Sequence, residues 1–238
     1  MTVLNKIIKA KKNRLKLLAI LLDPDKINVK DINKTIKKIE TLSADFIFVG
    51  GSSVKENATQ RLVKTLKNYT KIKIILFPGD VSQISTDADA LLFMSLLSGQ
   101  NPEYLINQQI RAVKKIKASC LEIIPTAYVL IDGGKISSVE KVSKTKPISQ
   151  NQQELIVNIA LAGQFMGKQL VYLEAGSGAN YPVDTNIINK VANQVEIPLI
   201  VGGGIRNFNQ IKEAFNNGAD LVVVGTAFEE NKLLLQAE

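Results

Sequence analysis

Short apolar runs alternate with amphipathic segments along the whole chain. In the runs, branched and aromatic residues stand on consecutive positions, a pattern typical of strands buried on both faces of a parallel sheet. We place these runs at residues 16–23, 45–51, 73–79, 90–97, 121–132, 169–176, 198–205 and 221–228. Most are separated by segments in which apolar residues recur every three or four positions, as on one face of a helix. Eight strand–helix units predict an α/β fold, a (β/α)8 TIM barrel, with 1–238 as a single domain.

The connection between the third and fourth runs departs from this pattern. Residues 80–89 are too few for a full crossover helix, so we predict a shortened connection that leaves one flank of the barrel less covered. A second departure is the polar stretch 133–147, which is rich in lysine and serine. We expect this stretch to extend over the mouth of the barrel.

The segment after the fourth run has a clear helix start. Asn101 can cap a helix and Pro102 suits the first helical position. Ile106, Ile110 and Val113 follow at helical spacing and are predicted to form the buried stripe of this helix. The last residues of the chain are predicted to form a short terminal helix.

The composition restricts the chemistry that is open to the chain. It contains no histidine, which excludes a serine–histidine triad, a histidine base and a histidine-bound metal. A base must then be Asp, Glu, Lys or Tyr, and a metal must have oxygen ligands, which favours Mg²⁺. The single cysteine, Cys120, excludes an internal disulfide framework and suits a reducing cytoplasm, where we expect the protein.

The formal net charge of +8 is spread over the chain rather than concentrated in blocks. It serves either solubility alone or attraction to polyanionic small substrates and anionic lipid headgroups. Nucleic acid is not expected as a partner, because aromatic residues make up only 5% of the chain and no aromatic-rich basic patch occurs. No apolar run has membrane-spanning length, and the basic N-terminus lacks the cleavage site of a signal peptide.

Glycine and polar residues collect where the predicted strands end, which in a barrel of this kind is where the active site lies. Gly203 and Gly204 follow the seventh run, and Gly225 and Thr226 follow the eighth. These two loops are the recurrent phosphate site of the fold, and glycine lets backbone N–H groups approach phosphate oxygens closely. We therefore predict a phosphate cradle, which Ser177 would complete from the sixth strand.

Two carboxylates at strand ends have more than one interpretation. Asp23 ends the first strand and could bind Mg²⁺ together with Ser52 on the next strand, although a short Asp-Pro-Asp segment is also a common turn. Glu174 ends the buried sixth strand and is either paired with a cation such as Arg206 or a general base with a raised pKa. Tyr172 points to the same face as Glu174, and it is either a hydrogen-bond donor to substrate or a core ring.

At these residues the chain resembles the geranylgeranylglyceryl phosphate synthase family, which includes the bacterial heptaprenylglyceryl phosphate synthases. The matching segments run in order through nearly the whole chain: LLDPDK, FVGGSS, FPG, ALLFMSLLSGQNPEYLI, EIIPTAYVLIDGGKISSV, YLEAGSGA, IVGGGIRN and GADLVVVGTAFE. GGGI and VVVGTA occur in many phosphate-binding barrels. YLEAGSG, DPD and LFMSLLSGQNP are much more specific.

The resemblance implies an Mg²⁺-dependent prenyltransferase that joins sn-glycerol 1-phosphate to an isoprenyl diphosphate, geranylgeranyl diphosphate being the one expected. Asp23 and Ser52 match the Mg²⁺ ligands, and Glu174, with Tyr172 beside it, matches the base that takes the proton of the glycerol C3 hydroxyl. The residues that match the glycerol 1-phosphate site are Tyr172, Leu173, Glu174, Ala175, Gly176, Ser177, Gly178, Gly203, Gly204, Gly225 and Thr226. The prenyl tail needs a long apolar groove, which we expect to open beside the short connection 80–89.

The resemblance further suggests a homo-oligomer, either a dimer or a hexamer, and a peripheral membrane contact is in keeping with a lipid product. Two other functions stay open at this point. One is an isomerase or aldolase that acts on a sugar phosphate, which would require paired acids or a Schiff-base lysine at a strand end. The other is a barrel that binds phosphate without catalysis, against which the joint presence of Asp23, Ser52 and Glu174 argues.

Overall fold

The apolar runs form parallel strands that pair in chain order. The computed structural model describes residues 1–230 and 233. Within them the strands are β1 (Leu17–Leu22), β2 (Phe46–Val49), β3 (Lys73–Leu76), β4 (Ala90–Leu96), β5 (Glu122–Leu130), β6 (Leu170–Glu174), β7 (Leu199–Gly202) and β8 (Leu221–Val224). Each pairs in parallel with the next, and β1 also pairs with β8, so that the sheet closes into a barrel. The predicted (β/α)8 fold is confirmed.

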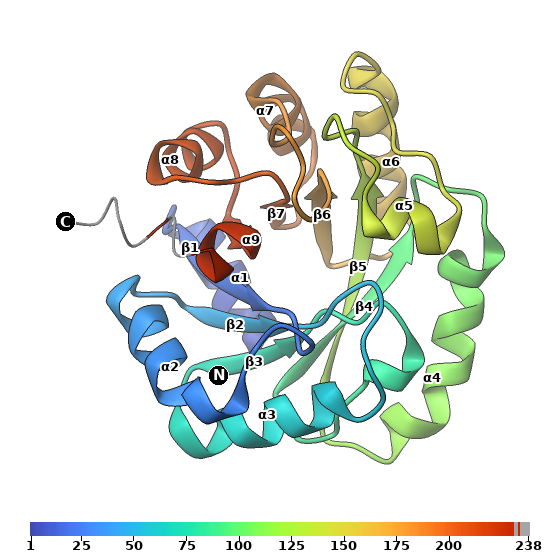
Figure 1. Ribbon diagram of the computed structural model, residues 1–238. Helices are drawn as coiled ribbons and strands as arrows, with labels where there is room; N and C mark the ends of the chain where they lie inside the picture. The colour runs from blue at the N-terminus through green and yellow to red at the C-terminus, as the bar shows by residue number, and fades with distance from the viewer. Residues whose placement is uncertain (231–232, 234–238) are drawn as a thin grey trace.

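Helices surround the strands, as Figure 1 shows. In the described residues they are α1 (Val3–Lys12), α2 (Ile32–Thr41), α3 (Ala58–Tyr69), α4 (Gln108–Lys117), α5 (Ser138–Ser143), α6 (Gln153–Phe165), α7 (Thr185–Gln194), α8 (Phe208–Asn216) and α9 (Thr226–Glu229). Shorter helical turns precede α2 and α4, at Val29–Asp31 and Glu103–Asn107. No helix in this part of the chain is both long and apolar enough to cross a bilayer.

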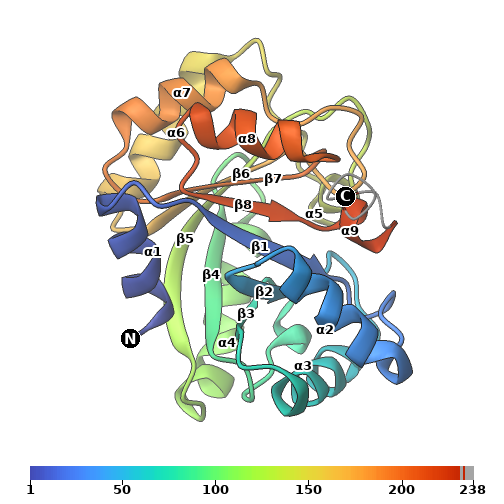
Figure 2. The same ribbon diagram turned by 90° about the vertical axis from the view of Figure 1, so that its left-hand side faces the viewer.

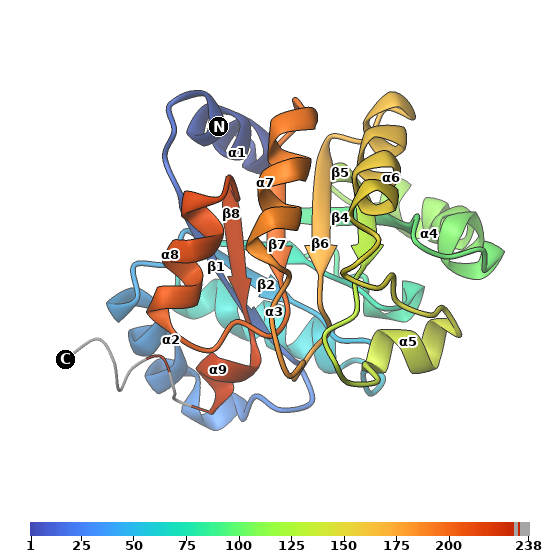
Figure 3. The ribbon, with the colours of Figure 1, turned by 90° about the horizontal axis from the view of Figure 1, so that it is seen from above.

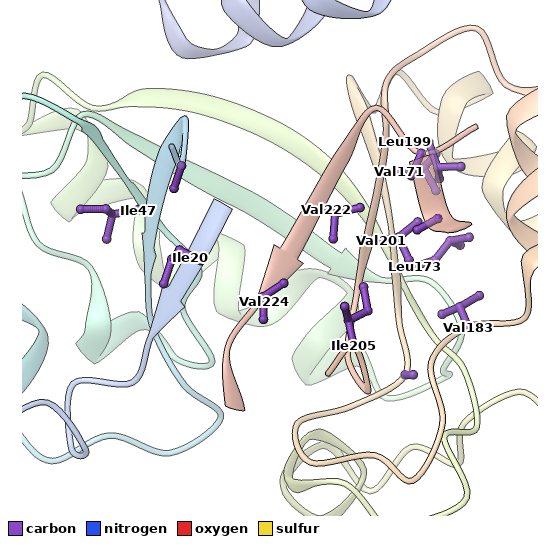
Figure 4. Close-up of a cluster of buried hydrophobic side chains, with 14 of the residues drawn as sticks. Ile20, Ile47, Val171, Leu173, Val183, Leu199, Val201, Ile205, Val222 and Val224 are labelled. Carbon is purple, nitrogen blue, oxygen red and sulfur yellow. The ribbon is translucent and has the colours of Figure 1, made fainter. Parts of the chain in front are cut away.

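The strands are apolar on both faces because each face meets a different part of the core. Alternate side chains, such as Ala19 on β1 and Phe46 on β2, fill the barrel interior. Their neighbours Ile20 and Ile47 face the helices and belong to the outer layer of the core, part of which Figure 4 shows. This two-residue alternation is what a pleated strand imposes.

The basic N-terminal segment forms helix α1, which closes one end of the barrel. Its buried residues Val3, Ile7 and Ala10 pack on the side chains of the barrel interior. The carboxylate of Glu122 at the start of β5 accepts hydrogen bonds from the backbone N–H groups of Val3 (2.5 Å) and Leu4 (2.9 Å), which have no partner inside the helix. Figures 2 and 3 show α1 at one end and α5 and α9 at the other, so ligands must enter from the end with α5 and α9.

The connection between β3 and β4 is short, as predicted, and contains only the turn Val81–Gln83 as a helical element in the described chain. The buried side chain of Gln83 donates to the carbonyl of Gly51 (2.7 Å) and accepts from the backbone N–H groups of Gly51 (3.2 Å) and Gly79 (3.3 Å). One glutamine thus fixes the loops after β2 and β3 against each other.

Two sequence-based expectations about elements need correction, and a third is not tested. Ile106, Ile110 and Val113 do not form a buried stripe: they are 52%, 61% and 47% exposed, and α4 instead packs inward through smaller or polar residues, including Ala112. Strand β8 ends at Val224 rather than at 228, because Gly225 turns the chain into α9. The predicted helix at the end of the chain falls largely on residues 231, 232 and 234–238, which lie outside the described residues.

Candidate active site

A cavity of about 220 Å³ opens at the carboxyl ends of the strands. Its walls come from the ends of β1, β2 and β3 on one side and of β6, β7 and β8 on the other, with β5 between them. The predicted site residues that line it are Asp23, Ser52, Tyr172, Glu174, Ser177, Gly178, Gly203, Gly204, Gly225 and Thr226. The structure therefore brings together the predicted metal ligands, the predicted base and most of the predicted phosphate cradle.

The phosphate side of the cavity is built from glycines and hydroxyls. Gly203 and Gly204 both have positive φ (+79° and +71°), which glycine adopts without strain. The hydroxyls of Ser177, in the loop after β6, and of Thr226, at the start of α9, lie 3.4 Å apart on this side of the cavity. The ammonium of Lys135, from the 133–147 stretch, lies 3.9 Å from where a Cβ on Gly178 would stand. The cradle thus offers backbone groups and two hydroxyls, with the Lys135 ammonium close to Gly178, a set suited to a phosphate.

Glu174 ends β6 at the floor of the cavity and is only 5% exposed. Burial raises its pKa to about 7, although the backbone N–H of Gly176, which donates to Oε1 at 2.7 Å, acts in the opposite direction. Arg206 does not pair with it; its guanidinium donates to the carbonyl of Ala179 instead. An acid with this pKa exchanges a proton near neutral pH, as a general base must.

Two tyrosine side chains lie beside Glu174, on β5 and β6. Burial, followed by the charge of Glu174, raises the pKa of Tyr128 and of Tyr172 well above the usual value, so both are neutral. The Tyr172 hydroxyl is the neighbour of the Glu174 carboxylate and lowers the pKa of that acid, against the larger effect of burial. Tyr172 also lines the cavity, so its hydroxyl is placed between the acid and a ligand bound there.

Asp23 lies on the opposite side of the cavity, against the end of β2. Its Oδ1 is 3.4 Å from where a Cβ on Gly51 would stand, next to Ser52, and it accepts the backbone N–H of Asp25 at 3.1 Å. Asp25 does not cap a helix; its carboxylate accepts the N–H of Lys55 and joins the first two loops. In the described chain no three acidic or cysteine side chains gather into a metal cluster, so a cation bound here would need further oxygen ligands from substrate or water.

Lys26 supplies a positive charge next to Asp23. Its ammonium lies 2.9 Å from Oε2 of Glu229 on α9 and 3.6 Å from Oδ2 of Asp23. These two carboxylates raise the pKa of Lys26 against the opposing effect of burial. The ion pairs connect the end of β8 to the loop after β1 and hold the rim of the cavity together.

A second, apolar cavity of about 110 Å³ opens directly beside the first one. It runs along the β3–β4 connection, where Val81 and Ile84 line it, and passes between β4 and the start of α4. Further lining residues are Leu91, Leu92, Phe93, Met94, Leu96, Tyr104, Ala112 and Val142. The flank with the short connection is therefore not sealed by packed side chains, and it carries a groove suited to a hydrocarbon.

The site therefore has two parts, a phosphate cradle and an apolar groove beside it. The sequence profile of the PcrB family matches residues 6–237.

The chain belongs to the PcrB family.

Relatives match this chain over nearly its whole length. A geranylgeranylglyceryl phosphate synthase of Zunongwangia profunda is 53% identical over 230 residues, which are 97% of this chain and 98% of the relative. The corresponding protein of Flavobacterium johnsoniae is 50% identical over 230 residues, 97% of this chain and 95% of that one. Among solved structures, the (S)-3-O-geranylgeranylglyceryl phosphate synthase of Thermoplasma acidophilum in complex with its substrate sn-glycerol-1-phosphate aligns with a TM-score of 0.90 and 37% identity, over 96% of this chain and 92% of that one.

Not every residue that the resemblance assigned to the phosphate site faces the cavity in this member of the PcrB family. Leu173 and Ala175 turn outward into the helix-facing layer of the core. Gly176 meets Ser137 from the 133–147 stretch, and its N–H is used by Glu174. Leu173 on β6 and Ala175 and Gly176 just after it therefore do not line the cavity.

Sequence reasoning also missed residues that line the cavity. Phe77, Tyr128 and Ser138 lie in the matching segments FPG and EIIPTAYVLIDGGKISSV but were given no role. Their place in the cavity depends on the register of strands far apart in the sequence. Lys26 stands just after the Asp-Pro-Asp segment, but its partner Glu229 is more than two hundred positions away, and only the closure of the barrel brings the two together.

Proposed function

We propose that this PcrB-family protein is a prenyltransferase that forms an ether between the C3 hydroxyl of sn-glycerol 1-phosphate and geranylgeranyl diphosphate, with release of diphosphate. The observation that carries the proposal is the position of Glu174. This buried acid, with a pKa of about 7, lies in a cavity that has a phosphate cradle on one side and adjoins an apolar groove on the other. The named relatives and the solved neighbour support the same substrates.

The geometry gives each residue a part in this reaction. The cradle of Gly203, Gly204 and Thr226 would bind the glycerol phosphate and direct its C3 hydroxyl toward Glu174. Glu174 would take the hydroxyl proton while the oxygen attacks C1 of the isoprenyl diphosphate, and the Tyr172 hydroxyl would orient the attacking oxygen. Holding two phosphorylated substrates in one site would lower the barrier by orienting the attacking oxygen toward C1.

Mg²⁺ is proposed as the cofactor, held by Asp23 and Ser52. The Asp23 carboxylate beside the Ser52 loop offers the hard oxygen donors that Mg²⁺ requires, and diphosphate and water would complete the shell. When bound, the ion would offset the charge of the leaving diphosphate. Turnover that persists unchanged in excess chelator would contradict this assignment and leave the neighbouring Lys26 as the counter-charge.

We also propose that the protein self-associates and that it contacts membrane surfaces. The exposed stripe of Ile106, in the turn before α4, and of Ile110 and Val113 on α4 is a surface that a second copy of the chain could cover, giving a dimer or a hexamer. Because the product is a lipid, we also propose a peripheral contact with anionic membrane surfaces. Complete recovery of the protein in the supernatant after sedimentation of anionic vesicles would contradict that contact.

A sugar-phosphate isomerase or aldolase is less well supported. A Schiff-base aldolase needs a lysine free to attack a carbonyl, whereas Lys26 at the cavity rim is held in two ion pairs. The apolar groove beside the cradle would also make no favourable contacts with a small polar sugar.

The decisive assay uses radiolabelled glycerol 1-phosphate, Mg²⁺ and a series of isoprenyl diphosphates. We expect an ether phosphate as product, and we expect kcat/KM to rise with pH and level off above about 7, as Glu174 loses its proton. Glu174→Gln should lower kcat by roughly a hundred-fold or more, whereas Glu213→Gln on the exposed face of α8 should not change it. Binding of glycerol 1-phosphate without consumption of any isoprenyl diphosphate would contradict the proposed reaction.

A further inference from the structure

The phosphate cavity and the apolar groove meet at a junction that both of them share. The residues that line both are Gly51, Ser52, Phe77, Tyr128 and Val139. In an isoprenyl diphosphate, C1 is the atom that joins the apolar tail to the phosphates. If the tail lies in the groove and the C3 hydroxyl lies against Glu174, C1 must lie at this junction. The inference that follows rests on the proposed function.

Bond breaking at C1 places positive charge on an allylic carbon. None of the five junction residues carries a charge, and the side chains of Phe77, Tyr128 and Val139 are aromatic or apolar in their greater part. Glu174 and Asp23 line the phosphate cavity but not the groove. The faces of aromatic rings attract cations through their negative quadrupole, and the attraction is stronger where water is excluded. Phe77 and Tyr128 are the rings at the junction.

The ring of Phe77 is fixed by other rings around it. It stacks on Tyr172 with centroids 5.1 Å apart and an interplanar angle of 17°. It also contacts Tyr128 at 5.9 Å and Phe48 at 6.4 Å between centroids. A ring held on several sides cannot turn away when charge develops, so its electrostatic effect is preorganised.

We propose that Phe77 is a catalytic residue whose ring, together with that of Tyr128, stabilises the positive charge that develops on C1 of the isoprenyl diphosphate. In this step the C1–O bond to diphosphate breaks and both electrons leave with the diphosphate. A lone pair of the glycerol C3 oxygen forms the new C1–O bond, and the hydroxyl proton passes to Glu174.

The test replaces Phe77 with phenylalanine that carries one, two or three ring fluorines. Fluorine withdraws electron density from the ring face and hardly changes its shape, so packing is preserved while attraction for a cation falls. We expect kcat to fall stepwise along the series, by roughly ten-fold in total. The affinity for an unreactive isoprenyl thiodiphosphate, measured by calorimetry, should stay constant, because no charge develops on its C1.

The matched control is the same fluorine series at Phe208, which packs on the outer core and lines neither cavity; there kcat should be flat. A flat kcat at Phe77, or a loss of thiodiphosphate affinity that parallels the loss of kcat, would overturn the inference and leave the proposed function intact. If the unsubstituted protein forms no ether in the same assay, the proposed function itself fails and this inference fails with it.

Discussion

Glu174 combines two requirements that oppose each other. As a general base it must lie where water is excluded, and that burial raises its pKa from 4.5 to about 7. Because the pKa of this carboxyl is higher in the folded chain than in the unfolded chain, it contributes to the stability of the fold when it is protonated. The contribution is fully present at low pH, below the pKa of the unfolded chain. That contribution is lost as the pH rises from about 4.5 through 7, and no more is lost at higher pH. The catalytic carboxylate therefore destabilises the fold at the pH where it works.

Replacing Glu174 by glutamine should reverse this effect. Glutamine carries no charge to desolvate, and its oxygen can still accept the N–H of Gly176. We expect the variant to be more stable than the parent by roughly 1–3 kcal/mol at pH 8 and equal to it at pH 4. Urea unfolding at the two pH values measures this. Equal stabilities of parent and variant at both pH values, or a variant less stable at pH 8, would show that the charged carboxylate does not destabilise the fold.

At the scale of residues, the sequence predicted which side chains line the cavity where the pattern is local, and their roles stay predictions. Glu174 and Asp23 stand out because a carboxylate at the end of a buried strand is rare, and the glycines of the cradle follow directly on their strands. Phe77 and Lys26 were not recognised as site residues, because their partners Tyr172 and Glu229 lie on other strands or helices and are set by barrel register.

At the scale of elements, the loops after β6 and β7 fit together at Gly203. A Cβ there would stand 2.4 Å from Oε1 of Glu174 and 2.6 Å from the backbone nitrogen of Gly176, and φ is +79°. Contacts this short cannot be relieved without moving the base or its loop. The cradle and the base are therefore one packed unit rather than two independent features.

Two alanine variants separate the clash from the backbone conformation. Gly167 has a similar φ of +83° but no atom within 4 Å of its missing Cβ, so Gly167→Ala should cost about 1 kcal/mol of stability and leave kcat unchanged. Gly203→Ala should cost about 2 kcal/mol or more and lower kcat by at least roughly ten-fold. Equal effects of the two substitutions in unfolding and activity measurements would contradict the packed arrangement.

The same scale shows why some elements escaped prediction. Hydrophobic spacing reports that a helix has an apolar face, not which surface covers it. Ile106, in the turn before α4, and Ile110 and Val113 on α4 point to solvent in the single chain. The spacing alone could not distinguish this from a face turned to the core. The end of β8 was likewise misplaced, since Thr226–Phe228 continue an apolar run although they form α9.

At the scale of the whole molecule, the exposed stripe on α4 makes a prediction about assembly. If a second copy covers it, a charge at its centre should weaken the contact. We expect the protein to elute as a dimer or larger species in size-exclusion chromatography with light scattering, and Ile110→Glu to shift it toward the monomer. Lys115→Glu, on another side of the same helix, should leave the mass unchanged. A monomeric parent protein would contradict the proposed assembly.

The barrel closure brings the two halves of the proposed reaction together, and the fate of one oxygen atom tests that directly. Glycerol 1-phosphate labelled with ¹⁸O at the C3 hydroxyl is incubated with geranylgeranyl diphosphate and Mg²⁺, and the products are examined by mass spectrometry. Attack of the C3 oxygen on C1 predicts an ether phosphate that keeps the label and a diphosphate that carries none. Labelled diphosphate, or free geranylgeraniol with the glycerol phosphate unconsumed, would contradict the assignment of this site to ether formation.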